Sequence, residues 1–227
     1  MEDSTFTNKN VIALSKDMVF VKMEAGKDTA TGDLYKIAGF PTIILMQSSG
    51  EEIDRIYGYL PPGEFVSTIQ SYLQGKETLE DLKNRFQKDS TDVELAFKLA
   101  DKYEARRSYD EALLCYQKVV ALDPENKKGK SQDALINIAW LEIRRKDYLK
   151  AVDAFKNFLE KYPKGEMALE AERYIPYSYA QAGDTAKALE LYQKFLTDHP
   201  SSADTGWVKE KIKQLKKEES TDSSRTQ

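Results

Sequence analysis

The chain has 227 residues, of which 32% are charged and 41% are hydrophobic, and its formal net charge is -4. This acidic balance argues against a nucleic-acid partner, because such proteins need a basic surface to displace counterions. We also expect no transmembrane segment, since no apolar run approaches the roughly 20 residues that span a bilayer. One cysteine and one histidine exclude an internal disulfide, a dithiol pair and a His/Cys metal site, so no metal or other cofactor is expected.

The first 76 residues alternate helix-like and strand-like segments, which indicates an α/β fold. Strand-like runs are rich in Val, Ile, Phe and Tyr, and polar or glycine-containing turns bound them. The predicted strands are 18–23, 42–47 and 53–59, and the predicted helices are 9–16, 29–37 and 61–75. Pro61 and Pro62 suit the first turn of the last helix, and Gly75 ends it.

Several motifs in this segment together resemble the back half of a thioredoxin-fold domain. They are Gly39-Phe40-Pro41-Thr42, the turn Ser49-Gly50, the run Ile53-Asp54-Arg55-Ile56, and Pro62-x-Glu64-Phe65. The match covers residues 1–75. In that family the proline matching Pro41 is cis, and its neighbours pair with an extended peptide substrate. The resemblance therefore implies a peptide-binding loop at Phe40, Pro41 and Thr42.

The redox motif of that family, W-C-x-x-C-K, is missing from this sequence. It would lie just before Met1, together with the central strand of the family's sheet. Without two cysteines no dithiol exchange can occur, so no catalytic residue is expected. Cys115, between Leu114 and Tyr116, is interpreted as a packing residue rather than a nucleophile. One hypothesis is that Met1 is an internal methionine of a longer protein; if Met1 is the true start, we expect a labile N-terminal half.

From Glu77 onward only helical periodicity remains. Leu79, Leu82 and Phe86 have the spacing of an amphipathic helix over 77–87, and Thr91 or Asp92 can cap the helix that follows. The period continues to residue 217. The polar, Ser/Thr-rich tail over 218–227 is predicted to be disordered.

An internal repeat organises this helical part. A small residue, an aromatic residue four positions later and a proline recur three times at the same offsets. The three sets are Ala112/Tyr116/Pro124, Ala151/Phe155/Pro163 and Ala188/Tyr192/Pro200. The alanine permits close approach of two helices, the aromatic fills the groove between them, and the proline ends the second helix.

These residues resemble the tetratricopeptide repeat over about 91–217. The repeats are longer than the usual 34 residues, because 39 and 37 residues separate the successive prolines. The run Phe158-Leu159-x-x-Tyr162-Pro163 is similar to the longer repeats of bacterial envelope proteins such as the TolA-binding family. Within the third repeat, Pro176 stands where the tetratricopeptide repeat family has a small residue, which predicts a kink or a loosened first helix.

The resemblance places partner binding on the concave face formed by the first helix of each hairpin. The corresponding positions are Phe97, Asp101, Ile136, Trp140, Arg144, Arg173 and Tyr177. An aromatic residue and two arginines in one groove suit an extended or acidic peptide. The alternative for Trp140 and Ile136 is packing against neighbouring repeats.

The predicted fold class is an incomplete α/β thioredoxin-like fold followed by an all-α solenoid of tetratricopeptide repeats. Its predicted parts are a truncated thioredoxin-like domain over 1–76, a helical linker or half-repeat over 77–90, three repeat hairpins over 91–217 and the tail over 218–227.

The predicted function is a scaffold that binds a protein or peptide partner and has no redox activity. The alternatives are a fragment of a thiol-disulfide oxidoreductase whose C-x-x-C motif lies upstream of Met1, and a bacterial envelope assembly scaffold. The compartment is open: cytoplasmic as written, and periplasmic or envelope if the N-terminus is incomplete.

Overall fold

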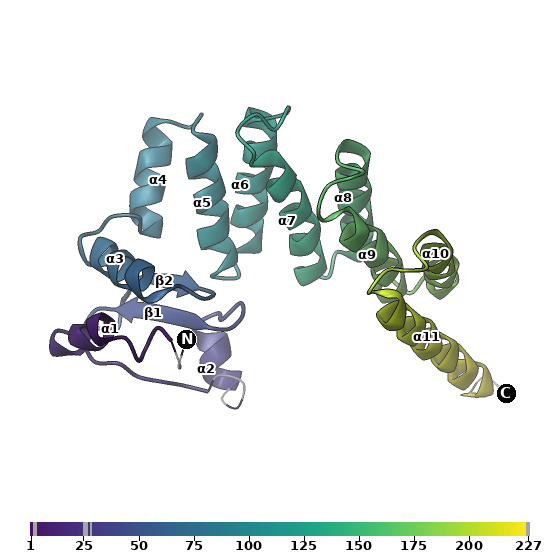
Figure 1. Ribbon diagram of the computed structural model, residues 1–227, viewed down its shortest axis with the longest axis horizontal. Coiled ribbons are helices and arrows are strands. Elements are labelled where there is room, and N and C mark those ends of the chain that lie inside the picture. The colour runs from purple at the N-terminus through teal and green to yellow at the C-terminus, as the bar shows by residue number, and fades with distance from the viewer. Residues whose placement is uncertain (2–3, 25–26, 28, 226–227) are drawn as a thin grey trace. The chain divides into compact units, whose positions relative to one another are not determined.

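The computed structural model describes residues 1, 4–24, 27 and 29–225 (Figure 1). The chain divides into two compact units, Met1–Leu122 and Asp123–Gln227. The first unit contains a small sheet with its helices and the first helical hairpin, and the second unit contains helices alone. The boundary between the two compact units therefore lies after the first helical hairpin. The domain boundary that we predict between residues 76 and 77 stays a prediction.

A two-stranded antiparallel sheet forms the centre of the α/β segment. Strand β1 (Thr42–Met46) pairs with β2 (Glu52–Tyr57), and Thr42 lies opposite Tyr57 at the open end of the hairpin. Gly50 has a φ of 87° in the connecting turn, a backbone conformation that glycine adopts without a steric penalty. Both strands that the sequence predicts here are therefore confirmed, to within one or two residues at each end.

Short helices surround this sheet, and one longer helix covers it. The short ones are α1 (Lys9–Ala13), its 3-10 continuation η1 (Leu14–Lys16) and α2 (Thr29–Leu34). The longer helix, α3 (Pro62–Leu73), contributes Phe65 and Ile69 to a core that also contains Val11, Leu45 and Ile56. Each of these five side chains is at most 9% exposed, so burial of this apolar face is what holds α1 and α3 against the sheet.

The strand predicted over residues 18–23 does not form. Val19 and Val21 are 89% and 78% exposed, and Phe20 is 45% exposed. The prediction was wrong because β-branched composition alone does not make a strand: the backbone groups must pair with a neighbour. Among the described residues the only ladder joins β1 and β2, so this segment has no neighbouring strand there.

Three helices complete the first unit. They are α4 (Leu79–Lys88), α5 (Val93–Glu104) and α6 (Tyr109–Leu122). The Thr78 hydroxyl caps α4 by accepting from the Asp81 amide, and the Asp92 carboxylate caps α5 by accepting from the Leu95 amide. Of the two capping candidates in the sequence, Asp92 is thus the one that is used.

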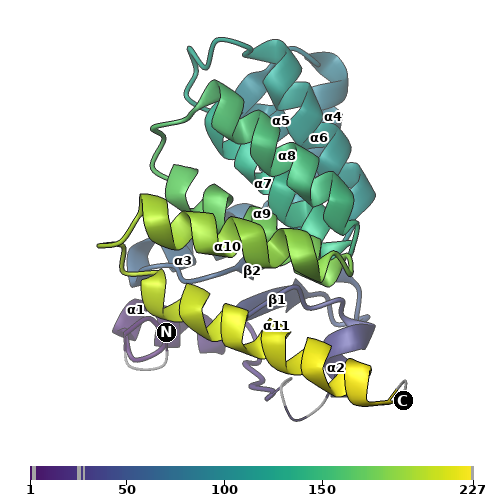
Figure 2. The same cartoon turned by 90° about the vertical axis from the view of Figure 1, so that its right-hand side faces the viewer.

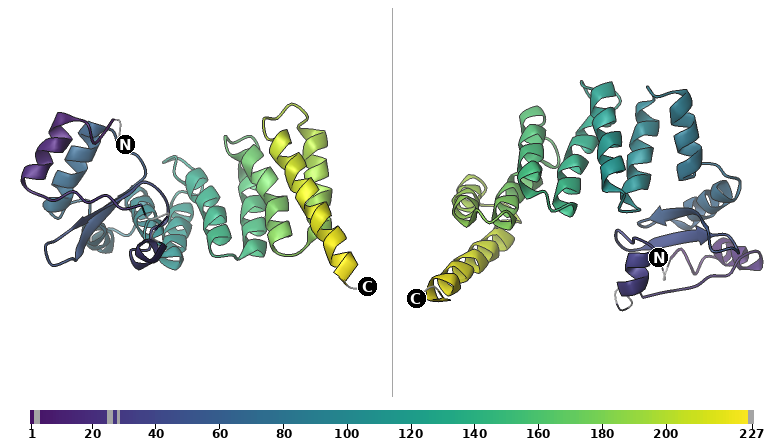
Figure 3. Two further views of the ribbon diagram at one scale, coloured as in Figure 1. Left: turned by 90° about the horizontal axis from the view of Figure 1, so that it is seen from below. Right: turned by 180° about the vertical axis from the view of Figure 1, so that it is seen from behind.

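The second unit repeats the helical hairpin. Its helices are α7 (Ser131–Arg144), α8 (Tyr148–Lys161), α9 (Ala168–Gln181), α10 (Thr185–Asp198) and α11 (Thr205–Arg225). Consecutive helices from α7 to α11 pack against one another, and Figures 2 and 3 show α9, α10 and α11 as successive neighbours. Helix α9 continues through Pro176, which is buried inside it and does not end it.

The repeated small and aromatic residues occupy the hairpin interiors, as we predict. Ala112, Ala151 and Ala188 are each 0% exposed, and the aromatic side chain four residues after each is at most 1% exposed. A residue in the left-handed backbone region also recurs at the bend of each hairpin, where Arg107, Lys146 and Gly183 all have positive φ. The next amide then bonds back to the first helix, as in Ser108 to Tyr103 and Asp184 to Tyr179, which is the Schellman pattern of helix ends.

The C-terminal segment differs from the predicted disorder. Helix α11 includes residues 218–225, and residues 226 and 227 lie outside the described part of the chain. Val208 and Leu215 bury the first half of α11 against α10. Residues 216–219 are two lysines and two glutamates, which are good helix formers, so they continue the helix beyond its packed part. The weaker helix formers over 220–224 do not explain its last turns.

Candidate functional site: two surfaces on the helical hairpins

The loop predicted to bind peptide precedes β1. The bond between Phe40 and Pro41 is cis, and the Thr42 hydroxyl donates to the Gly39 carbonyl at 2.7 Å. A Cβ on Gly39 would lie 2.7 Å from the Tyr57 hydroxyl, so a larger residue here would displace the end of that exposed side chain. The Phe40 side chain is 70% exposed, which leaves it accessible; its role in peptide binding stays a prediction.

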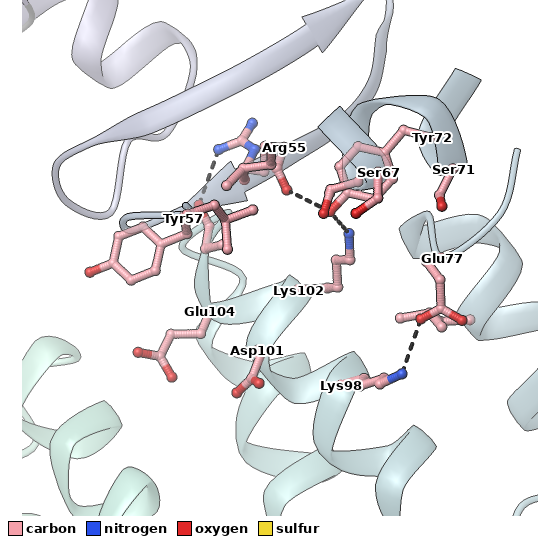
Figure 4. Close-up of a pocket in the computed structure, with 15 residues that line it drawn as sticks. Arg55, Tyr57, Ser67, Ser71, Tyr72, Glu77, Lys98, Asp101, Lys102 and Glu104 are labelled. Atoms are coloured by element: carbon pink, nitrogen blue, oxygen red, sulfur yellow. Dashed lines mark hydrogen bonds and ion pairs between the residues drawn. The ribbon is translucent and has the colours of Figure 1, made fainter. Parts of the chain in front are cut away.

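A cleft of about 610 Å³ lies in the first unit between β2 and α3 on one side and α5 on the other (Figure 4). Apolar side chains such as Ile56, Leu60 and Leu82 line part of it. The α3 wall adds hydroxyl groups, and the α5 wall adds charges of both signs. These polar lining residues are Ser67, Thr68, Ser71 and Tyr72 on α3, and Lys98, Asp101, Lys102 and Glu104 on α5.

The sequence-predicted residue Asp101 lines this cleft, and Phe97 does not. The Tyr116 hydroxyl donates toward carboxylate oxygens of Asp101 and Glu104, at 2.7 and 3.0 Å. Burial, followed by the two carboxylates, raises the pKa of Tyr116 far above its ordinary value, so the phenol stays protonated. The Phe97 ring packs edge-on against Tyr116 at 5.5 Å, which indicates that it supports the wall rather than a ligand.

A charge cluster around Asp54 adjoins the cleft at two of its lining residues, Lys102 and Tyr72. The Lys102 ammonium lies 2.9 Å from an Asp54 carboxylate oxygen and donates to the Tyr72 hydroxyl at 2.8 Å. Burial lowers the pKa of Lys102, and the Asp54 carboxylate opposes that shift. Burial also raises the pKa of Tyr72. The sequence shows neither the burial of Asp54 nor its cationic partners, because Asp54 stands inside a strand-like run.

In the second unit, aromatic side chains form a continuous row along α7, α9 and α11. Tyr174 is its centre: the rings of Trp140, Tyr177 and Trp207 lie 4.4, 5.4 and 5.8 Å from it. All four rings are half-buried. We call these four residues the aromatic row. Half-buried aromatic side chains supply large contact area at low entropic cost, which is the composition of protein-binding surfaces.

Cationic side chains cover the aromatic row. The Arg173 guanidinium lies 5.0 Å from the Tyr174 ring and 5.1 Å from the Trp207 ring. The Lys211 ammonium lies 5.6 Å from Trp207. Arg173 also pairs with Asp204 at 3.1 Å, so part of its charge is compensated within the unit.

The predicted residues of the second unit divide into surface and core. Trp140, Arg173 and Tyr177 belong to the aromatic row or its cations, and Arg144 is exposed at the end of α7. Ile136 is only 5% exposed, as expected of a residue that packs between helices. The predicted set lacks Tyr174, Trp207 and Lys211. Helical periodicity could have suggested Tyr174, but α11 begins after Pro200, the last residue of the third repeated set, and gave no such signal.

Cys115 is half-buried on α6, and burial raises its pKa to about 11. Its thiol is therefore protonated at neutral pH and is a poor nucleophile. Within the described part of the chain, no three His, Cys, Asp or Glu side chains are placed to hold a metal ion. No described helix combines the length and the apolar character that a membrane span requires.

Three protein families match successive parts of the chain. Residues 1–73 match the thioredoxin-like domain family, residues 93–126 match the tetratricopeptide repeat family, and residues 128–209 match the outer membrane lipoprotein family YfiO. The chain thus combines a thioredoxin-like segment with tetratricopeptide-type helical repeats, as the sequence predicts. A comparison of the sequence with curated proteins finds no significant match.

Solved repeat proteins are similar at low identity. A crystal structure of MamA protein is 19% identical, with a TM-score of 0.48, over 63% of this chain and 72% of that one. A second MamA structure is 22% identical, with a TM-score of 0.47, over 62% and 75%. A Podosopora anserina putative kinesin light chain with TPR-like repeats is 16% identical, with a TM-score of 0.46, over 60% and 69%.

Proposed function

We propose that this chain is a non-enzymatic protein-binding module whose main partner surface is the aromatic row of the second unit. The observation that supports it most is the coincidence of four half-buried rings with two cations on α7, α9 and α11. Tetratricopeptide repeats bind protein partners on the first helices of their hairpins, where Trp140 and Tyr177 lie. Rings with cations above them favour a peptide that carries both acidic and apolar side chains.

Lys211→Ala and Tyr177→Ala test this proposal, because they remove one cation and one ring of this surface and neither side chain is fully buried. Partners are captured from a lysate on the immobilised chain, and the affinity of the main captured protein is then measured by calorimetry. We expect each variant to weaken binding by about tenfold or more, as at a typical hot spot. Leu149→Ala is the control, since Leu149 is 60% exposed on α8. Unchanged affinity in both variants, with circular dichroism unchanged, would contradict the proposal.

The absence of redox activity is part of the same proposal. The chain has a single cysteine, and its thiol is protonated at neutral pH. An insulin-reduction assay with dithiothreitol is expected to show no acceleration above the rate of the reductant alone. Measurable turnover that survives Cys115→Ser would favour the oxidoreductase alternative.

A second candidate function is assembly of a bacterial envelope, and it rests on the match of residues 128–209 to the outer membrane lipoprotein family. The test compares capture from a detergent-solubilised envelope fraction with capture from a cytosolic fraction of a bacterial lysate. Enrichment of an envelope protein that is lost in Tyr177→Ala supports this candidate, and equal capture from both fractions counts against it.

A further inference from the structure

The Asp54 carboxylate joins three elements of the first unit. It lies on β2, and its side chain is 0% exposed. It accepts from the backbone amide of Leu79, the first residue of α4, at 2.6 Å. It also pairs with two cations from α5 and its end, Lys102 at 2.9 Å and Arg106 at 2.7 Å. A buried carboxylate tolerates desolvation only when such partners satisfy it.

The neighbours of Asp54 reinforce the same connection. Arg106 also pairs with Glu52 at 2.7 Å, so it bridges two residues of β2. In the opposite direction Arg55, which is 6% exposed, donates to the carbonyl of Ala105 at 3.1 Å and to the carbonyl of Tyr35 at 2.9 Å. We call Glu52, Asp54, Arg55, Lys102 and Arg106 the buried latch. It links the β-hairpin to α5 by two kinds of contact. Carboxylates of β2 pair with the cations Lys102 and Arg106, and the Arg55 guanidinium of β2 donates to the backbone carbonyl of Ala105.

Separation of the β-hairpin from α5 would take both cations away from Asp54 and would leave Lys102 and Arg106 without these carboxylates, whereas Glu52 would keep its pair with Arg55 on the same strand. Removing one member of a buried ion pair is far more costly than breaking a surface pair, because the other member stays desolvated. The first unit contains such a surface pair for comparison. Arg107 and Asp33 lie 3.2 Å apart and join α2 to the same end of α5, but their side chains are 42% and 76% exposed.

We propose that residues 1–122 fold and open as one cooperative unit, in which the buried latch fastens the first tetratricopeptide hairpin to the thioredoxin-like sheet. The thioredoxin-like segment then unfolds together with the first hairpin of the repeats and is not a separately folding domain. The partner of this α5 face is the chain's own β-hairpin. Lys102 and Arg106 are consequently unavailable to an external protein, and partner binding is left to other surfaces.

Hydrogen-exchange mass spectrometry on the full chain tests this inference. The variant is Asp54→Asn, which keeps the shape of the side chain and removes its charge. We expect exchange in peptides from β2 and from α5–α6 to accelerate together, by roughly a hundredfold and by equal factors, because opening is shared. Peptides from α8 and α10 are expected to keep their protection. Asp33→Asn is the matched control, with a change of no more than about threefold.

Acceleration in β2 alone, with α5 and α6 still protected, would overturn the inference, as would exchange that does not change at all. If Asp54→Asn unfolds the whole chain, Arg106→Gln decides, because Lys102 still neutralises Asp54 in that variant. It is expected to accelerate β2 and α5–α6 equally, by about tenfold or more. Unequal factors in Arg106→Gln refute shared opening. The result is independent of partner binding, so it can fail while the proposed function stands.

Discussion

Replacing tyrosine by phenylalanine is expected to change stability in opposite directions at two equivalent positions of the repeats. Tyr116 and Tyr192 both follow the small residue of their hairpin by four positions, and they are 1% and 0% exposed. The Tyr116 hydroxyl reaches two carboxylates, at 2.7 and 3.0 Å. The Tyr192 hydroxyl is buried and has no hydrogen-bond partner among the described residues. The two rings are buried to the same extent, so the two sites differ mainly in the surroundings of the hydroxyl group.

The magnitudes follow from the two environments. A hydrogen bond to a charged group contributes about 1.5–3 kcal/mol, so Tyr116→Phe is expected to destabilise the α5–α6 hairpin by about 2 kcal/mol. A buried hydroxyl without a partner costs about 1–3 kcal/mol. Removing it in Tyr192→Phe is therefore expected to stabilise the α9–α10 hairpin by about 1 kcal/mol.

Native-state hydrogen exchange is the suitable assay, because two compact units need not unfold in one transition. Since about 1.4 kcal/mol corresponds to a factor of ten, α5–α6 peptides should exchange about thirtyfold faster in Tyr116→Phe. Peptides from α9–α10 should exchange about fivefold slower in Tyr192→Phe. Tyr59→Phe is the control, because Tyr59 is 55% exposed. A destabilised Tyr192→Phe would refute the reasoning, because it would mean that the hydroxyl makes a favourable contact.

Three further outcomes are expected. Burial raises the pKa of Glu142, so this carboxyl group binds a proton more tightly in the folded protein than in the unfolded chain. The stability that this proton contributes is present below the unfolded pKa of Glu142 and is lost as pH rises through its folded pKa. Glu142→Gln should remove that slope from urea unfolding curves, and an unchanged slope would contradict the assignment. Ala188→Leu should cost about 1–3 kcal/mol, because Ala188 is 0% exposed, while Ala186→Leu on the exposed side should be nearly neutral by the same measurement. Cys115, with its pKa raised to about 11, should react with iodoacetamide at pH 8 roughly a hundredfold more slowly than in the unfolded chain; equal rates would show that the thiol is accessible and ionised.

Local chemistry explains why much of the architecture could be predicted. The offsets between Ala112 and Tyr116, and their two later copies, define close helix packing without reference to any distant residue. The cap at Asp92 likewise depends on an amide three residues away. The hairpin of β1 and β2 needs only two adjacent apolar runs and a glycine turn. Features of this kind are encoded within a few residues, so the sequence predicts them well.

The partner surface was predicted only in part, for a related reason. Trp140 and Tyr177 follow from the periodicity of the repeats, but Trp207 joins them from α11, which begins after Pro200, the last residue of the third repeated set. Its contact with Tyr174 depends on how α11 packs, and no local pattern determines that packing. The hydroxyls of Tyr116 and Tyr192 show the same limit, since identical repeat positions have different surroundings.

The sequence by itself determined the helical hairpins, the two strands of the β-hairpin and the presence of a single thiol, because each depends on residue type and short spacing. Only the tertiary structure decided that residues 18–23 form no strand, because a strand depends on a paired neighbour that composition does not reveal. It also decided that Asp54 is buried among cations from α5. A charged residue in a strand-like run is normally read as solvent-exposed, and the partners that permit its burial lie about fifty residues away.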